Sequence, residues 1–339
     1  MNNTYKMKHY EGSGTMTDFF NTYEGIKQWR DENISKHITN MQSLNKFHDK
    51  VLTSVFALSI KRLDKGMPPC EYSWFITGSG GRFEQGLISD QDHGMIFETH
   101  TDDNQAYFTA LGSEISYGLN VVGYPYCQGN IMSSNPIWCK SVNDWKNQLI
   151  SWMKASSWES IRYLQIFYDA RTLKGKESFV PFLKSLIYDY QSEHPYLLKR
   201  FMENILHIKN AIGPLGQLLV EEHGDHQGSI DLKYSAFLPY VNAVRLLAIK
   251  EGVQETSTLK RIDHLMRFNR YGDELGDHKM NFELLLKYRL SLFEVESYKE
   301  THFLSIKNLS KEEKKIIKKV LKDGKKLHQF VCGIIEKGC

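Results

Sequence analysis

The sequence lacks paired cysteines and long apolar runs. Its 339 residues include five cysteines, an odd number without a CxxC pair, so neither a disulfide framework nor a structural zinc site is indicated. No stretch approaches the roughly 18 unbroken apolar residues of a membrane span, and the first residues contain no apolar signal core. We therefore expect a cytoplasmic protein that has no membrane partner.

The sequence also lacks a strong excess of either charge. The formal net charge is +3, which is too small to indicate a nucleic-acid partner. The segment "KEEKKIIKKVLKDGKK" is locally basic, but Ile316, Ile317 and Val320 recur within it at helical spacing. This spacing favours the solvated face of a helix over a nucleic-acid patch.

Periodicity and turn residues divide the chain into three parts. Apolar residues recur every three to four positions between residues 18 and 63 and again beyond Ser178, which predicts helices in both regions. Between them, "YSWFITGSG" and "DHGMIFE" are typical of buried strands, with a helix expected over 104–119. We expect "GYPYCQGNIMSSNPIW" to be a strand flanked by irregular backbone, and "IRYLQIFYDART" to lead to a helix end at "LKG".

These segments predict an α+β fold. We expect an N-terminal helical element over residues 1–66, a domain with a mixed sheet over 67–180, and a C-terminal helical domain over 181–339. A substrate cleft is expected between the last two parts.

A glycine-rich turn follows the first predicted strand. The turn "GSGGR" contains Gly78, Ser79, Gly81 and Arg82. A strand that ends at such a turn and feeds a helix presents free backbone N–H groups, and glycine lets a phosphate approach closely. The Ser79 hydroxyl and the Arg82 guanidinium would add donors to a bound triphosphate.

Two acids follow this turn. Asp90 and Asp92 stand at alternate positions of the second predicted strand, so both carboxylates are expected on one face. Two carboxylates that share a face repel each other unless a cation lies between them. Their hard oxygen ligands suit Mg²⁺ that bridges to phosphate oxygens.

The combined pattern resembles the DNA polymerase beta-like nucleotidyltransferase superfamily. It is most similar to a family of nucleotidyltransferases related to the N-terminal domain of protein-PII uridylyltransferase. The shared motifs are GSxGRxEQ, SDQD, GYPxCxGNxM with NPxW, and DxR with a glycine four residues on. They occur here at residues 78–85, 89–92, 123–132, 135–138 and 169–175. "HQGSIDLKYSAFLPYVNAVRLLAI" resembles the helical domain of the same family.

The resemblance implies transfer of a nucleoside monophosphate from an NTP to an acceptor hydroxyl. Such enzymes usually have a third carboxylate, which the segment "VVGYPYCQGNIM" does not provide. Asp169 is a candidate, although it could instead pair with Arg171 to hold a helix. Asp231 is another candidate, which could equally cap the helix that follows it. Lys233 could bind a phosphate or remain solvated.

Two alternatives to this enzyme stay open. The missing third acid favours a nucleotide-binding regulatory module without turnover. An enzyme that acts on a small molecule in place of a protein is the other alternative. The acceptor, protein or small molecule, and the preferred NTP are not set by the sequence.

Several other residue types near these motifs have simpler interpretations. His93 follows Asp92 and should point to the opposite sheet face as a packed residue. Cys127 is expected to be a small buried residue, not a nucleophile. A zinc site at His223 and His226 is disfavoured because no third ligand lies nearby. The tryptophans that recur every six or seven residues are expected to pack: Trp138, Trp145, Trp152 and Trp158.

Overall fold

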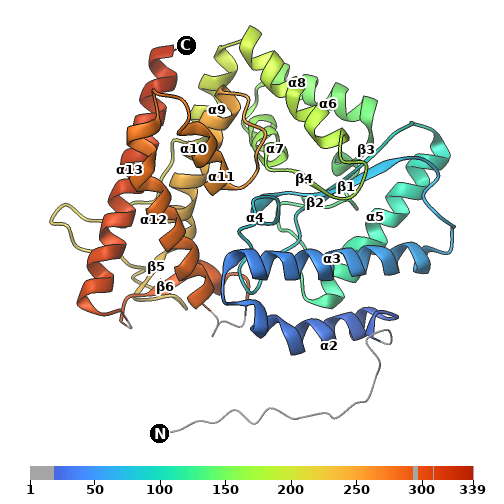
Figure 1. Cartoon of the computed structure of the whole chain (residues 1–339), viewed down its shortest axis with the longest axis horizontal. Coiled ribbons are helices and arrows are strands. Elements are labelled where there is room, and N and C mark those ends of the chain that lie inside the picture. The colour runs from blue at the N-terminus through green and yellow to red at the C-terminus, as the bar shows by residue number, and fades with distance from the viewer. Residues whose placement is uncertain (1–18, 293–296, 308, 339) are drawn as a thin grey trace, which may run out of the picture.

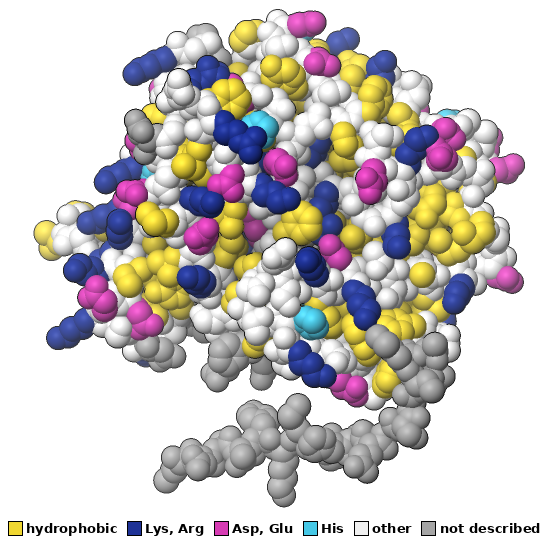
Figure 2. Space-filling view, in the orientation of Figure 1, with side chains coloured by type: hydrophobic (Ala, Val, Ile, Leu, Met, Phe, Trp, Pro, Cys, Tyr) yellow, Lys and Arg dark blue, Asp and Glu magenta, His cyan; other side chains and the backbone are white. Residues whose placement is uncertain are grey.

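The computed structural model describes residues 19–292, 297–307 and 309–338. It has the predicted α+β architecture, in which a small mixed sheet with helices on both faces adjoins a C-terminal group of helices (Figure 1). Within these residues no helix is both long and apolar enough to cross a membrane. Basic and acidic side chains are interspersed over the face shown in Figure 2, which agrees with the small net charge.

The sheet contains four strands in the order β3-β2-β1-β4. Strand β1 (Tyr72–Ile76) pairs antiparallel with β2 (His93–Phe97) and with β4 (Arg171–Gly175), while β3 (Cys139–Ser141) runs parallel to β2. The prediction that a buried strand ends at the glycine turn is confirmed, since the single helical turn α4 (Gly78–Gly81) follows β1 almost directly.

Side chains alternate between the two faces of the sheet. Trp74 and Ile76 join the core formed with α2 (Tyr23–Asn33), α3 (Met41–Leu63) and α5 (Asp102–Val122), as expected for a period of two. Phe75 joins the opposite core, with α6 (Val142–Ala155) and α7 (Trp158–Tyr168). The helices predicted over 18–63 and 104–119 are confirmed. Because α2 and α3 share a core with the sheet, the N-terminal helices help to fix its position.

The C-terminal part is mainly helical, as predicted. Its core is continuous with the α6–α7 face of the sheet, so both parts of the molecule pack as one hydrophobic unit. The basic segment lies in the last helix, where Ile317 and Val320 are buried and the lysines face outward, which confirms the amphipathic interpretation. The helices are α8 (Phe179–Glu193), α9 (Tyr196–Ile205), α10 (Leu238–Lys250), α11 (Thr258–Leu265), α12 (Gly272–Ser291) and α13 (Lys311–Gly338).

Short elements complete the chain. An antiparallel pair of short strands, β5 (Ser229–Asp231) and β6 (Phe303–Ser305), lies toward the lower end of the C-terminal part in Figure 1. A π-helical turn, η3 (Lys233–Phe237), leads from β5 into α10. The 3-10 turns are η1 (Ile34–His37), η2 (Pro136–Trp138) and η4 (Glu300–His302).

Three local predictions were wrong. Residues 123–135 form no strand, and pairing starts only at Cys139 after the irregular segment. The "LKG" segment is not a helix end, because Gly175, at φ 93°, belongs to β4 and packs against the carbonyl of Tyr72. Asp90 and Asp92 lie just before β2, not on it. Domain limits at 66/67 and 180/181 stay predictions.

Candidate active site

The glycine turn and the acid pair meet at the end of β1. The Thr77 N–H donates to the Asp92 carbonyl at 2.9 Å, which extends the β1–β2 pairing to the first residue before the turn. At Gly78, which has φ 55°, a Cβ atom would overlap the Asp92 carboxylate. Glycine at position 78 therefore allows both the left-handed backbone and the close approach of the acid.

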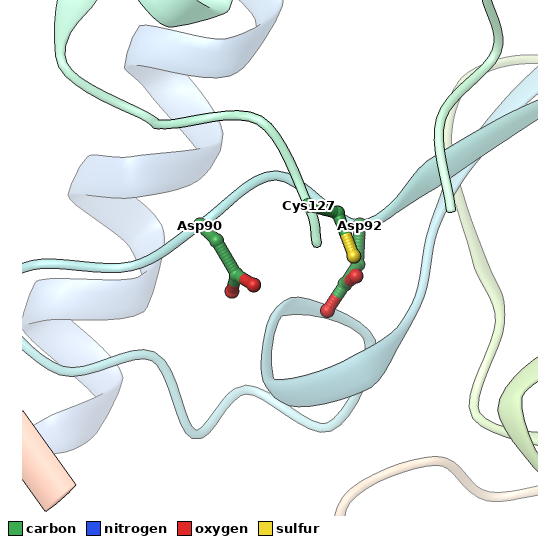
Figure 3. Close-up of side chains that lie close together, drawn as sticks. All are labelled: Asp90, Asp92 and Cys127. Atoms are coloured by element: carbon green, nitrogen blue, oxygen red, sulfur yellow. The ribbon is translucent and has the colours of Figure 1, made fainter. Parts of the chain in front are cut away.

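The two carboxylates form a compact cluster with a thiol. One ligand atom each from Asp90, Asp92 and Cys127 lies within 4.8 Å of the others. Figure 3 shows both aspartates pointing to the same side of their segment, with Cys127 approaching from a separate loop. The expectation that the acids share a side therefore agrees with the geometry, although they lie outside the strand.

Burial and mutual repulsion change the acidity of the pair. Burial, followed by the charge of Asp92, raises the pKa of Asp90 to about 7. Burial also raises the pKa of Asp92, against the hydrogen bond from Cys127 and the charge of Lys233. Burial and the neighbouring Asp92 raise the pKa of the Cys127 thiol to about 12. A cation between the two carboxylates would offset both their burial and their mutual repulsion.

The acid pair fits a hard divalent cation. Asp90 Oδ1 is enclosed by the protein and has no hydrogen-bond partner within the described residues, and a bound cation would satisfy this oxygen. Two carboxylates leave most of the coordination sphere to water and phosphate oxygens, which is the environment that Mg²⁺ prefers. The Cys127 thiol is a soft ligand that Mg²⁺ does not require.

The acid pair opens into a cleft of about 1190 Å³ between the sheet domain and the C-terminal helices. The cleft is large enough for a nucleotide and part of an acceptor. The predicted site residues that line it are Gly78, Ser79, Arg82, Asp90, Asp92, Asp231 and Lys233. Its position between the two parts is as predicted from the sequence.

Lys233 lies close to the acid pair. It begins the π-helical turn η3, an irregularity common at functional sites. Its ammonium lies 5.6 Å from the centre of the Tyr298 ring and 5.8 Å from that of Tyr234. Burial lowers the pKa of Lys233, while the charge of Asp90 opposes this shift. The Lys233 ammonium is thus placed in the cleft near the acid pair.

Asp169 lies outside the cleft, where three arginines bind its carboxylate. Its Oδ1 accepts from Arg245 at 3.0 Å and from Arg261 at 2.7 Å, and its Oδ2 accepts from Arg82 and Arg245 at 2.6 Å each. Burial would raise the pKa of Asp169, but the three guanidiniums hold it well below its usual range. With four bonds to arginines, this carboxylate is poorly placed to serve as a metal ligand. The expected partner Arg171 instead binds Asp49 at 2.6 Å.

Arg82 belongs to the same network of hydrogen bonds. Its Nε donates to Glu84 at 2.7 Å, in addition to its bond with Asp169. Its charge is therefore largely compensated within the protein, although it lines the cleft. Gly81 does not line the cleft, because its Cα packs against the Asp169 carbonyl.

Asp231 has a cap-like arrangement. Its Oδ1 accepts from the Tyr234 N–H at 3.2 Å, as a capping side chain does, and its Oδ2 lies 3.4 Å from the Lys209 ammonium. The Ser235 hydroxyl also donates to the Asp231 carbonyl. Asp231 lines the cleft but is not part of the Asp90–Asp92–Cys127 cluster.

Sequence reasoning missed the contribution of the last helices. Tyr298, Arg289 and His302 line the same cleft, and burial, followed by the charge of Asp90, raises the pKa of Tyr298. These three residues belong to no motif with chemical meaning, and they reach the site only because the C-terminal helices fold back onto the sheet domain. Charged and aromatic residues in "YRLSLFEVESYKETHF" were the one available signal.

The simpler interpretations mostly agree with the structure. His93 is buried, accepts from Trp74 Nε1 and contacts Gln91, so it is a packed residue as expected. Of the four tryptophans, Trp138, Trp145 and Trp152 pack together. Trp158 is 60% exposed, so the packing prediction was wrong there. The interpretation that His223 and His226 bind no zinc stays a prediction.

Taken together, the mixed sheet, the glycine turn and the acid pair define a nucleotidyltransferase-type domain with a second, helical domain across the cleft. Comparison with protein families agrees with this class. Residues 26–159 match the family described as "Putative nucleotidyltransferase DUF294", and residues 195–333 match "Putative nucleotidyltransferase substrate binding domain". The chain belongs to this nucleotidyltransferase family. No curated protein gave a match.

Proposed function

We propose that the protein is a Mg²⁺-dependent nucleotidyltransferase that transfers a nucleoside monophosphate from an NTP to an acceptor hydroxyl. The observation that supports this most is the Asp90–Asp92 pair, with its unpartnered buried oxygen, beside the Gly78–Ser79 turn in a nucleotide-sized cleft. The family assignment supports nucleotidyl transfer at the level of the reaction class.

The chain's own residues would bind and orient the reactants. The Gly78–Ser79 turn and Lys233 would hold the polyphosphate, and Asp90 and Asp92 would hold Mg²⁺. The cation, when bound, neutralises phosphate charge and polarises the acceptor. The acceptor oxygen bonds to the α-phosphorus, the bond to the bridging oxygen of the β-phosphate breaks, pyrophosphate leaves, and the hydroxyl proton passes to a carboxylate oxygen of the pair. Positioning and charge stabilisation supply most of the rate enhancement.

The substrate follows from resemblance alone. Similarity to protein-PII uridylyltransferases supports UTP as donor and a protein hydroxyl as acceptor. The unpaired cysteines at 70, 127, 139 and 332 support a reducing, cytoplasmic setting. A small hydroxylated acceptor remains the alternative for the same chemistry.

The test is incubation of the protein and host-cell lysate with each of four α-labelled NTPs and Mg²⁺. We expect label on one lysate species together with pyrophosphate release. Asp90→Asn and Asp92→Asn should each weaken Mg²⁺-dependent NTP binding at least about tenfold, because one fewer carboxylate leaves the cation with too little ligand charge. Label on a small molecule would show that the acceptor is a small molecule and not a protein. Unchanged Mg²⁺-dependent affinity in both variants would remove the metal assignment.

One observation favours a second candidate, a nucleotide-binding module without turnover. In the described part of the chain, the acid pair is joined by a thiol and not by a third carboxylate. The same assay separates the two functions. NTP binding without pyrophosphate release from any of the four nucleotides would establish the module.

A further inference from the structure

Arg289 differs from three buried arginines near the cleft, and also from Arg162, which lines the cleft but is exposed. Arg82, Arg245 and Arg261 all bind the Asp169 carboxylate. Arg289, on α12, forms no ion pair among the described residues, and its enclosed Nε has no hydrogen-bond partner there. The side chain is half-buried and lines the cleft. Arg289 is therefore a cation at the wall of the cleft that has no ion-pair partner among the described residues.

The packing around Arg289 fixes its position. A Cβ at Gly86 would lie 3.2 Å from the Arg289 Nε, so the arginine packs closely against the backbone that connects the glycine turn to the acid pair. Its guanidinium carbon lies 5.3 Å from the centre of the Phe237 ring. A long side chain held in this way loses little further entropy on binding a ligand.

Two more nitrogen groups line the same cleft. The Lys233 ammonium lies beside the Tyr298 ring, and the His302 Nε2 is enclosed without a partner in the described residues. Burial, together with the charges of Lys233 and Arg289, lowers the pKa of His302 to about 3. His302 is therefore neutral near pH 7 and can offer one N–H beside two cations.

The charges of Glu84 and Asp90 act on Arg289, but neither carboxylate forms an ion pair with it. Glu84 accepts from Arg82 and from the Thr258 N–H, and Asp90 belongs to the acid pair. A partly desolvated guanidinium without a partner costs free energy, which an anion can offset. The fork of N–H donors in arginine matches phosphate oxygens well.

We propose that Arg289, with Lys233 and His302, binds the terminal phosphates of the nucleotide, the part that leaves as pyrophosphate. This proposal rests on the proposed function, and it assigns many of the phosphate contacts to residues of the C-terminal domain. Arg82, whose charge is compensated by Glu84 and Asp169, then contributes less than the sequence motif suggests. A bound polyphosphate would bridge the two sides of the cleft.

The experiment uses the full chain and inorganic tripolyphosphate as the probe, with calorimetry in EDTA and in Mg²⁺. The variants are Arg289→Gln and Arg289→Lys, and exposed Arg267→Gln is the matched control. We expect Arg289→Gln to weaken tripolyphosphate binding at least about tenfold, as for loss of a charge-assisted contact. Arg289→Lys should lose less, since it keeps the charge. Adenosine affinity should not change in any variant.

Thermal unfolding gives an independent readout. Without ligand, Arg289→Gln should unfold at the same or a higher temperature than wild type, because an uncompensated charge has been removed. The rise in midpoint that tripolyphosphate produces in wild type should be mostly lost. An arginine with a purely structural role would lower the unliganded midpoint and leave the ligand-induced rise intact.

The outcomes separate this site from the transfer reaction. Tripolyphosphate affinity within twofold of wild type in both Arg289 variants would overturn the phosphate site, even if the enzyme transfers nucleotides. Failure of the wild-type protein to bind tripolyphosphate would overturn it as well. Binding that depends on Arg289, without pyrophosphate release from any NTP, would support the site and overturn the transfer activity.

Discussion

The Cα of Gly78 lies directly against the Asp92 carboxylate. A Cβ there would lie 3.1 Å from Asp92 Cγ and would overlap the nearer carboxylate oxygen. The glycine turn and the acid pair, separated in sequence, are thus two sides of one packed contact. A phosphate held by the turn would lie beside the acids that hold its cation.

Gly78→Ala should therefore displace Asp92. We expect Mg²⁺-dependent NTP affinity to fall at least about tenfold, because the acid can no longer reach its position. The left-handed backbone at φ 55° should add a stability loss of about 1 kcal/mol. The control is Gly224→Ala, where φ is 82° but no atom lies within 4 Å of the new Cβ. The control should lose similar stability and keep its affinity, as measured by denaturation and calorimetry.

The sequence predicted the parts of the site that depend on local geometry. The turn after β1 and the alternate acids are set by neighbours in the chain, so glycine and spacing were sufficient to find them. The partners of Asp169 could not be predicted, because Arg245 and Arg261 reach it from helices far along the chain. The contribution of Tyr298 was missed for the same reason.

Loss of Asp169 should lower the stability of the protein more than it lowers turnover. Asp169→Asn leaves three buried guanidiniums without their shared counter-charge, so we expect a loss of about 3–5 kcal/mol in the free energy of unfolding. Asp231→Asn retains a side chain that can cap η3 and should cost less than about 1 kcal/mol. Chemical denaturation checks both values.

Pyrophosphate release by the two variants tests their proposed catalytic role. We expect folded Asp231→Asn to keep its turnover, since Asp231 engages Tyr234 and Lys209. Folded Asp169→Asn, studied below its unfolding temperature, should also retain turnover. Abolished turnover with intact NTP binding in either variant would restore that residue as the third acid.

Stability should depend on pH through His93. Burial lowers its pKa from 6.5 to about 3, so the folded state binds the proton less readily than the unfolded state. Above pH 6.5 His93 is neutral in both states, and its effect on the free energy of unfolding is negligible. As the pH falls from 6.5 toward 3, the unfolded state binds a proton that the folded state does not, and stability is lost. Between pH 7 and pH 5 this histidine should lower the free energy of unfolding by about 2 kcal/mol. In His93→Gln the fall in unfolding free energy over this range should be smaller by that amount; an equal fall would contradict the assignment.

Cys127 occupies the place where a third ligand would complete the acid cluster, since its sulfur lies within 4.8 Å of oxygens from both aspartates. Cys127→Asp should therefore strengthen Mg²⁺ binding at least about threefold, because it adds ligand charge. It should also lower the metal-free stability by about 1 kcal/mol or more, because a third carboxylate joins two that already repel. Cys127→Ser is the matched control, similar in size but uncharged.

Calorimetric Mg²⁺ titration and thermal unfolding with and without the metal measure both effects. The control should leave Mg²⁺ affinity near that of wild type. If Cys127→Asp lowered the metal-free stability but left Mg²⁺ affinity unchanged, residue 127 would not reach the bound cation. The site would then hold its metal through Asp90 and Asp92 alone, with water and phosphate oxygens as the remaining ligands.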